Sequence, residues 1–232
     1  MSVNPTYLQM FSTVTESGEL RLELKEQETP KPGPDQVLVR IEATPINPSD
    51  LGVMFGFTDM SAGTWVDGAL TAPVSEQGMR IMKARIGQAL TVGNEGAGTV
   101  VATGDSDAAK NLDGKIVAIA GGGMYGQYRC VEVSACLPLM EGHTAKDGAS
   151  SFVNPMTALA MIETMRMEGH TALIHTAAAS NLGQMLNRIC QADGVELVNI
   201  VRKEEQATLL KDMGAKYVVN SSADSFMADL TD

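Results

Sequence analysis

The sequence is short of basic residues for its length. Its 232 residues include 17 Lys and Arg against 28 Asp and Glu, which gives a formal net charge of −11 at pH 7. A nucleic-acid surface needs clustered Lys and Arg to neutralise phosphates, and the chain contains no basic cluster. The composition therefore excludes a nucleic-acid partner and indicates an acidic, well-solvated exterior.

Cysteines and long apolar runs are also scarce. The three cysteines, Cys130, Cys136 and Cys190, are an odd number without CxxC spacing, which is typical of reduced thiols rather than a disulfide framework. The first residues lack the basic and apolar regions of a signal peptide, and no apolar run is long enough to span a membrane. We therefore expect a cytoplasmic protein without membrane contact.

The first part of the chain is expected to be β structure broken by turns. Thr29–Asp35 holds three prolines, which cannot donate to a strand ladder and so mark a turn. Short alternating or apolar runs predict strands at Gly18–Leu24, Gln36–Thr44, Gly96–Gly104, Gly114–Ala120 and Gln127–Leu139. Many short strands between glycine-bounded turns favour a small β-barrel or sandwich over residues 1–153.

Residues 51–90 show no steady hydrophobic period. We expect a long irregular connection here, with a helical piece near Met79–Arg85. Connections of this length usually serve as lids or insertions.

Helix and strand alternate in the second part of the chain, from Asn154 onward. Strands are predicted at Thr171–His175, Val195–Val201 and Lys216–Asn220, and helices at Asn154–Met165, 182–190 and Glu204–Ala215. The strands and the two helices between them form a β-α-β-α-β unit, one half of a Rossmann doubly wound parallel sheet. Because the complete fold has two halves, residues 154–232 are predicted to be the first half, with the C-terminal half missing from this chain.

The loop after the first of these strands has one glycine where a dinucleotide loop usually has three. We expect Asn181 to take a left-handed backbone in place of a glycine, and Gly183 to permit close packing of helix and strand. The helix that follows offers free N–H groups and a positive dipole end to an anion. On the loop alone two interpretations stay open: a pyrophosphate site over Ser180–Gly183, or a turn that binds nothing.

The end of the second strand bears on the choice of cofactor. An NAD-preferring sheet carries Asp or Glu there to bind the ribose 2′-hydroxyl. Here the strand ends with Arg202 and Lys203, and a pair of cations suits an additional 2′-phosphate. The pattern favours NADP(H); the alternative is a pair of solvated charges at a strand end.

Four stretches in a fixed order carry more information than any one alone: VLVRIEATPINPSDL, VGNEGAGTVVATG, VNPMTALAM and HTAAASNLGQML. Together they resemble the medium-chain dehydrogenase/reductase superfamily, in its zinc-independent quinone oxidoreductase and enoyl-thioester reductase branch. The resemblance implies a GroES-like β-barrel catalytic domain over residues 1–153 and the first half of an NADP-binding Rossmann domain over residues 154–232. It also implies a homodimer for the full-length protein.

The same resemblance assigns residues to a site. It places Asn47 and Thr157 beside the nicotinamide ribose and carboxamide as catalytic residues; the alternatives are a turn-forming Asn before Pro48 and a Thr that only packs or caps. Asp50 and Glu95 recur in the family motifs, and we expect both to be structural carboxylates. The cofactor-binding residues it implies are Asn47, Thr157, Ser180, Asn181, Leu182, Gly183, Arg202 and Lys203.

We expect no metal. Asn47 and Asn94 stand where the alcohol dehydrogenases of this superfamily have Cys and His, and a neutral amide is a poor zinc ligand. His143, His170 and His175 show no ligand spacing, and His175 is expected to be a satisfied core residue. Without a Lewis acid, reduction of an activated acceptor is favoured over oxidation of an alcohol.

The implied activity is an NADPH-dependent transfer of hydride to a quinone or a conjugated (2-alkenyl) carbonyl. One departure weakens the enoyl-thioester version: Phe57 and Thr58 stand where those reductases have a proton-donating Tyr. Tyr125 is another candidate, although its glycine-flanked position is more typical of turn packing. The alternatives are an enoyl-thioester reductase, a catalytically silent NADP(H)-binding protein, and a non-enzymatic interaction protein.

Overall fold

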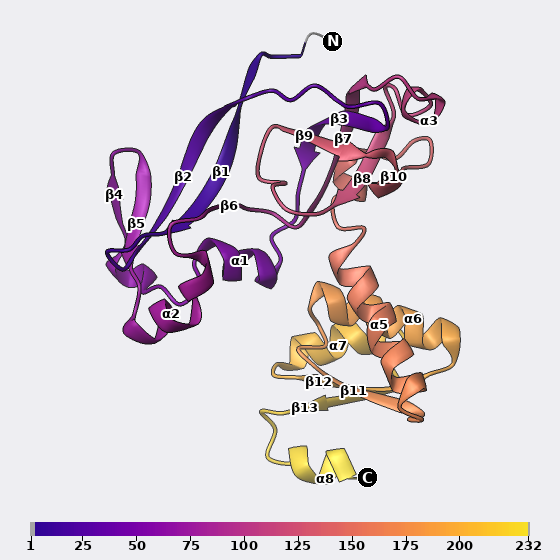
Figure 1. Cartoon of the computed structure of the whole chain (residues 1–232). Helices are drawn as coiled ribbons and strands as arrows, with labels where there is room; N and C mark the ends of the chain where they lie inside the picture. Colours follow the sequence, from indigo (N-terminus) through magenta and orange to yellow (C-terminus); the bar gives the residue numbers. More distant parts are fainter. Residues whose placement is uncertain (1–2, 232) are drawn as a thin grey trace. The chain divides into compact units, whose positions relative to one another are not determined.

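The computed structural model describes residues 3–231. They divide into two compact units, and the boundary along the chain lies between Ser151 and Phe152. The first unit is built of antiparallel strands and short helices, and the second alternates strand and helix (Figure 1). Each unit has its own buried hydrophobic clusters.

Two five-stranded antiparallel sheets form the first unit. One has the order β4-β5-β2-β1-β6 and the other β10-β8-β7-β3-β9, and a bridge between Gln9 and Gly126 joins them. The strands are β1 (Thr6–Val14), β2 (Glu19–Glu28), β3 (Gln36–Ala43), β4 (Thr64–Val66), β5 (Ala69–Pro73), β6 (Ala89–Thr91), β7 (Glu95–Thr103), β8 (Ile116–Ala120), β9 (Tyr128–Glu132) and β10 (Cys136–Pro138). The domain of short strands that was expected in the first part of the chain is thus confirmed.

Short helices connect the strands of this unit. They are α1 (Pro48–Met54), α2 (Glu76–Ile81), α3 (Asp107–Lys110) and α4 (Ala145–Gly148), with single turns η1 (Met60–Ala62), η2 (Lys83–Arg85) and η3 (Val133–Ala135). The last carbonyls of α1 are bonded to distant side chains: Arg85 donates to the Val53 carbonyl at 3.1 Å and Ser12 to the Met54 carbonyl at 3.1 Å. These bonds fix α1, and with it the Asn-Pro turn at its start, against β1.

The helical piece expected near Met79–Arg85 is confirmed by α2 and η2, but the expectation of an otherwise irregular connection over residues 51–90 is wrong. This region contains the hairpin β4–β5, which extends the first sheet, and the helical turns α2 and η2. Leu70 of β5 pairs with Leu22 of β2, a residue far away in the sequence. Strand β5 is therefore stabilised by a non-local partner, which a local hydrophobic period cannot reveal.

The second unit is a three-stranded parallel sheet in the order β11-β12-β13. Its elements are α5 (Val153–Met167), β11 (Ala172–Thr176), α6 (Asn181–Asp193), β12 (Glu196–Val201), α7 (Glu204–Asp212), β13 (Tyr217–Asn220) and α8 (Phe226–Thr231). Helices α5, α6 and α7 lie over one face of the sheet, and α8 lies on the other side (Figure 1). The predicted β-α-β-α-β order is confirmed.

Local sequence explains the limits of α6. Ser180 caps its start by accepting a hydrogen bond from the Gly183 N–H at 3.1 Å, and Gly194 ends it in a left-handed conformation with φ 68°. Leu186 and Cys190 point from one face of the helix into a cluster shared with Ile162 of α5. No helix within residues 3–231 is long and apolar enough to cross a bilayer.

Candidate functional site

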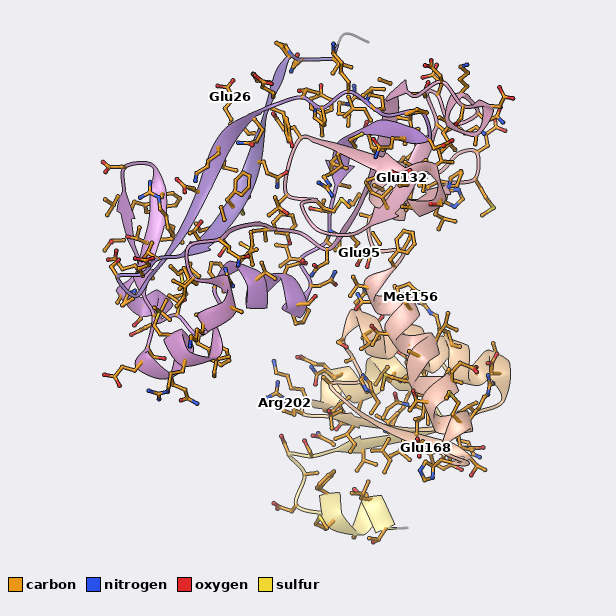
Figure 2. The ribbon with its side chains drawn as sticks, in the orientation of Figure 1. Glu26, Glu95, Glu132, Met156, Glu168 and Arg202 are labelled. Atoms are coloured by element: carbon orange, nitrogen blue, oxygen red, sulfur yellow. The ribbon has the colours of Figure 1, made fainter. Side chains whose placement is uncertain are left out.

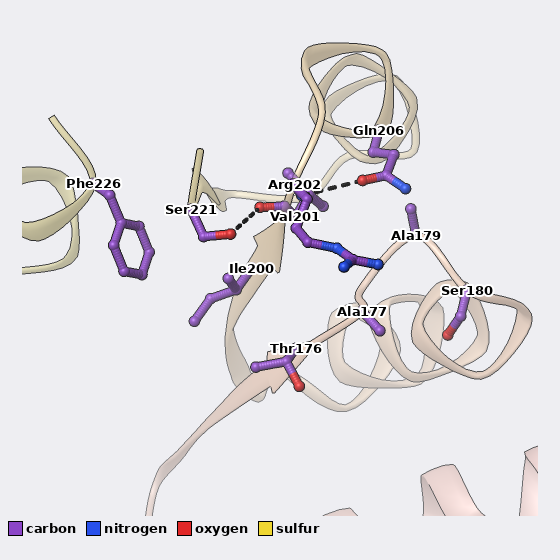
Figure 3. A pocket seen from close by; sticks show the side chains of 10 residues that line it. All are labelled: Thr176, Ala177, Ala179, Ser180, Ile200, Val201, Arg202, Gln206, Ser221 and Phe226. Carbon is purple, nitrogen blue, oxygen red and sulfur yellow. Dashed lines mark hydrogen bonds between the residues drawn. The ribbon is translucent and has the colours of Figure 1, made fainter. Parts of the chain in front are cut away.

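A cavity of ≈ 630 Å³ opens where the strands of the parallel sheet end. Arg202 lies at this end of the second unit and Glu168 at the opposite end (Figure 2). The cavity is lined by Thr176, Ala177, Ala179, Ser180, Ile200, Val201, Arg202, Gln206, Ser221 and Phe226 (Figure 3). Parallel α/β sheets bind ligands at the carboxyl ends of their strands, and this cavity lies at that edge of the sheet.

The loop between β11 and α6 forms one wall of this cavity. Its left-handed residue is Ala177, with φ 56°, whereas Asn181 is the first residue of α6. The expectation that Asn181 replaces a glycine in a left-handed position is therefore wrong. Asn181 lies after the cap, where the helix itself imposes right-handed dihedral angles.

Gly183 is required by close packing. A Cβ atom at this position would collide with the backbone carbonyl of Ala178, which is itself buried. The single glycine of the loop thus lets the first turn of α6 approach the preceding loop. Leu182, next to it, packs its side chain against the cluster of α5 and α6, so this side chain is directed away from a ligand at the helix start.

The two cations after β12 differ in their surroundings. The Arg202 side chain extends toward the Ala177–Ala179 loop and lines the cavity (Figure 3). Lys203 is the cap residue of α7, lies outside the cavity lining, and pairs with Glu205 at 3.4 Å. Among the ten lining residues Arg202 is the one with an ionisable side chain. The cavity therefore presents a single positive charge and no carboxylate.

Gln206, Ser221 and Phe226 are among the lining residues that sequence reasoning missed. Gln206 accepts a hydrogen bond from the Arg202 N–H at 3.1 Å, and Ser221 donates to the Val201 carbonyl at 3.0 Å. Phe226, at the start of α8, supplies an apolar wall. The only signal for Ser221 was its place directly after a predicted strand, since the ends of parallel strands meet at one edge.

A second cluster of polar residues lies in the first unit, around the start of α1. Asp50 accepts hydrogen bonds from the backbone N–H of Asn47 at 2.7 Å and of Asn94 at 2.9 Å. Asp50 therefore links Asn47 and Asn94, the two residues that stand in place of zinc ligands. As expected, it is a structural carboxylate that satisfies backbone N–H groups of the turn. Glu95 is fully buried and accepts a hydrogen bond from the side-chain Nδ2 of Asn47 at 2.8 Å.

Tyr125 belongs to this cluster. Its hydroxyl donates to the Pro45 carbonyl at 3.0 Å, and burial together with the nearby Asp50 carboxylate raises the pKa of Tyr125 to about 12. At the position of the family's proton-donating Tyr, Phe57 is exposed, and the Thr58 hydroxyl is buried without a hydrogen-bond partner among the described residues. Thr58 is therefore poorly placed to donate a proton.

The remaining predicted residues are found as follows. Thr157 lies on α5 in the second unit, where its hydroxyl donates to the Val153 carbonyl of the same helix. His175 is not the satisfied core residue that we expected: its Nε2 is buried without a partner among residues 3–231, and burial lowers its pKa. The described residues contain no group of three or more His, Cys, Asp and Glu that could hold a metal.

Comparisons with known proteins agree with this architecture. Residues 33–141 match the alcohol dehydrogenase GroES-like domain. A structure from Mesorhizobium loti assigned as an NADPH:quinone reductase is 32% identical, with a TM-score of 0.69 over 99% of this chain and 64% of that chain. A mycobacterial protein complexed with NADPH shares the fold, at 21% identity and a TM-score of 0.64, over 94% of this chain and 61% of that one.

Among curated proteins, the mitochondrial enoyl-[acyl-carrier-protein] reductase of Bos taurus is 29% identical over 210 residues, which are 85% of this chain and 48% of that protein. The chain thus spans about half the length of the curated relatives it matches. With its GroES-like β domain and parallel sheet, the chain belongs to the medium-chain dehydrogenase/reductase superfamily. Within it, the chain falls in the quinone oxidoreductase and enoyl-thioester reductase branch.

Proposed function

We propose that the protein containing this chain is a zinc-independent, NADPH-dependent reductase that transfers hydride to a quinone or a conjugated carbonyl. The observation that carries the proposal is the charge of the cavity at the sheet edge. Its one ionisable side chain is the cation Arg202, at the place where an NAD-preferring site has a carboxylate. A phosphate on the adenosine ribose fits this charge, whereas a bare 2′-hydroxyl does not need it.

The loop around Ser180 fits a pyrophosphate. Small side chains at Ala177 and Ala179 leave the backbone open, and α6 directs its free N–H groups and positive dipole end toward the cavity. The three names in the comparisons that mention a cofactor, one NADPH complex and two NADPH:quinone reductases, support the same choice. We assign the pyrophosphate to Ser180–Gly183 and the 2′-phosphate to Arg202, with Lys203 contributing only at longer range.

When bound, the reduced nicotinamide supplies a hydride, and the protein holds donor and acceptor in reach of one another. We assign Asn47 and Thr157 to the binding of the nicotinamide ribose and carboxamide, with residues 1–153 as catalytic domain and 154–232 as cofactor domain. At Asn47 and Asn94 the chain offers amides that are weak zinc ligands, so polarisation of an alcohol by a metal is disfavoured. The reaction that this set of residues favours is therefore the reduction of an already activated acceptor.

An enoyl-thioester reductase is the second candidate. Its support is the series of mitochondrial enoyl-[acyl-carrier-protein] reductases among the relatives. The absence of a Tyr at Phe57 and Thr58 favours the quinone acceptor, because hydroquinone oxygens take protons from water without a dedicated donor. Homodimer formation and a cytoplasmic location stay predictions.

Cofactor choice tests the proposal directly. We expect Arg202→Ala to weaken NADPH binding by about tenfold or more, because a charge-assisted bond to the 2′-phosphate is lost. NADH binding, which lacks that phosphate, should change little. The measurement is titration of both cofactors by nicotinamide fluorescence, with the wild type and Arg202→Ala.

Lys203→Ala is the matched control, because Lys203 is adjacent, equally charged and paired with Glu205 outside the cavity. Its effect on NADPH should be clearly smaller. Equal affinity of the wild type for NADPH and NADH, unaffected by either substitution, would show that the 2′-phosphate assignment is wrong.

A further inference from the structure

Gln206 lines the cavity at the sheet edge, and the assignments above give it no role. It lies in the first turn of α7, and within residues 3–231 its side chain makes one hydrogen bond: Oε1 accepts the backbone N–H of Arg202 at 3.1 Å (Figure 3). Because a backbone N–H only donates, it binds the oxygen end of the amide and leaves the nitrogen end, Nε2, turned away from it. The two N–H donors of Nε2 are therefore available to a ligand.

The Gln206 amide and the Arg202 guanidinium come from the same side of the cavity. Both residues belong to the connection between β12 and α7, and their hydrogen bond ties the backbone of Arg202 to the first turn of α7. Both line the cavity, and in Figure 3 both nitrogen-bearing ends are turned toward the loop that holds Ala179. A ligand group bound by the guanidinium therefore lies on the side to which the amide is directed.

One guanidinium leaves part of a phosphate ester unsatisfied. Such a group carries about −1.5 to −2 charges at pH 7 and has three acceptor oxygens. A guanidinium supplies one positive charge and binds two of these oxygens in its bidentate mode. The neighbouring cation Lys203 is outside the cavity lining, and the carboxylates of Glu204 and Glu205 begin α7. A further donor inside the cavity would thus stabilise the phosphate.

The hydroxyl groups of the cavity lining are less suited to this task. Ser221 donates its proton to the Val201 carbonyl at 3.0 Å. Thr176 and Ser180 belong to the wall formed by β11 and the loop that follows it. Gln206 is therefore the neutral side chain of the β12–α7 side that has unused donors.

We propose that Gln206 is a specificity-determining residue, whose side-chain amide donates a hydrogen bond to the 2′-phosphate of NADPH beside the Arg202 guanidinium. The inference rests on the proposed function, in which Arg202 binds that phosphate. A hydrogen bond is stronger when its acceptor is ionised, so the amide favours the phosphate over the neutral 2′-hydroxyl of NADH. Gln206 thus raises the preference for NADPH without adding a second charge to the cavity.

The test measures the ratio of the NADH to the NADPH dissociation constant in the full-length protein, by nicotinamide fluorescence. We expect Gln206→Met, which has a side chain of similar length but no donor, to lower this ratio by about five- to tenfold. Gln206→Glu keeps an acceptor for the Arg202 N–H and places a carboxylate against the phosphate. It should lower the ratio further, because like charges repel.

Two comparisons separate a direct contact from other effects. In the Arg202→Ala background both substitutions should still lower the ratio, because the residue at position 206 itself faces the phosphate. Gln191→Met and Gln191→Glu are the matched controls. Gln191 is also a helical glutamine with one side-chain bond to a backbone group, from Nε2 to the Met213 carbonyl at 3.0 Å, but it is not part of this cavity lining. Both control variants should leave the ratio unchanged.

The outcomes separate this inference from the proposed function. A ratio that keeps its wild-type value in Gln206→Met or Gln206→Glu would overturn the role of Gln206 and leave the assignment of Arg202 intact. So would a fall that disappears in the Arg202→Ala background, since Gln206 would then act only by holding Arg202 in place. If Gln206→Met does not fold, Gln206→Glu decides by the same two criteria. A wild type that binds NADPH and NADH equally would overturn both this inference and the assignment of the 2′-phosphate to Arg202.

Discussion

The loop between β11 and α6 achieves its backbone course with residues that differ from those of a glycine-rich loop. Ala177 adopts the left-handed backbone conformation, and Gly183 lets the first turn of α6 approach the Ala178 carbonyl closely. The loop therefore forms with one glycine where three are usual. The sequence identified Gly183 and its role, because only glycine lacks a side chain. It could not identify Ala177, because the backbone angles of an alanine are set by the surrounding structure.

Gly183→Ala tests the packing argument. The new Cβ would collide with the Ala178 carbonyl, so we expect the free energy of unfolding to fall by about 1–3 kcal/mol and NADPH binding to weaken. Gly52→Ala is the matched control: Gly52 also lies in a helix, α1, but its Cβ would meet open space. That change should raise the free energy of unfolding by up to about 1 kcal/mol. Denaturant titrations measure both, and equal effects would contradict the argument.

At the scale of elements, the start of α6 has a structural role, to which the proposed function adds a binding role. The Ser180 hydroxyl caps the helix, and Ser180 also lines the cavity. A cap residue before an apolar helix face can be read from sequence. The position of Arg202 relative to this helix start cannot be predicted from the sequence, because it depends on the pairing of β11 with β12.

Ser180→Ala should lower the free energy of unfolding by about 1 kcal/mol through loss of the cap, and should also weaken NADPH binding. Ser75→Ala is the control, since Ser75 caps α2 in the first unit with a comparable bond to the Gly78 N–H. It should show the loss of stability without the loss of affinity. Unfolding and fluorescence titrations give the two readouts. An unchanged NADPH affinity in Ser180→Ala would remove Ser180 from the pyrophosphate site.

On the scale of the whole molecule, the first unit is held together by contacts between segments that are far apart in the sequence. Gln9 of β1 donates a hydrogen bond to the Tyr125 carbonyl at 3.2 Å, while the Tyr125 hydroxyl reaches Pro45 before α1. One tyrosine, in the loop between β8 and β9, thus connects the sheet that contains β1 to the turn that carries Asn47. Its ionisation should therefore affect the stability of this unit.

The pKa of Tyr125 is raised from 10.0 to about 12, so the folded protein binds this proton more tightly than the unfolded chain. The stabilisation is complete below pH 10 and is lost as the pH rises toward 12. We expect the free energy of unfolding to fall over this range, and to fall less in Tyr125→Phe. Tyrosinate absorbance should show one group fewer near the end of the titration in that variant. Equal pH dependence of both proteins would contradict the raised pKa of the half-buried Tyr125 hydroxyl.

The sequence by itself determined the β-rich and alternating parts of the chain, the glycine of the loop between β11 and α6, and the cations after the second strand. These follow from local periods and from residue types with narrow conformational or chemical roles. Tertiary structure alone decided that β5 pairs with β2, that Arg202 rather than Lys203 enters the cavity, and that Glu95 meets Asn47. Each of these depends on which distant segments become neighbours, and that is set by packing of the whole unit rather than by any local stretch.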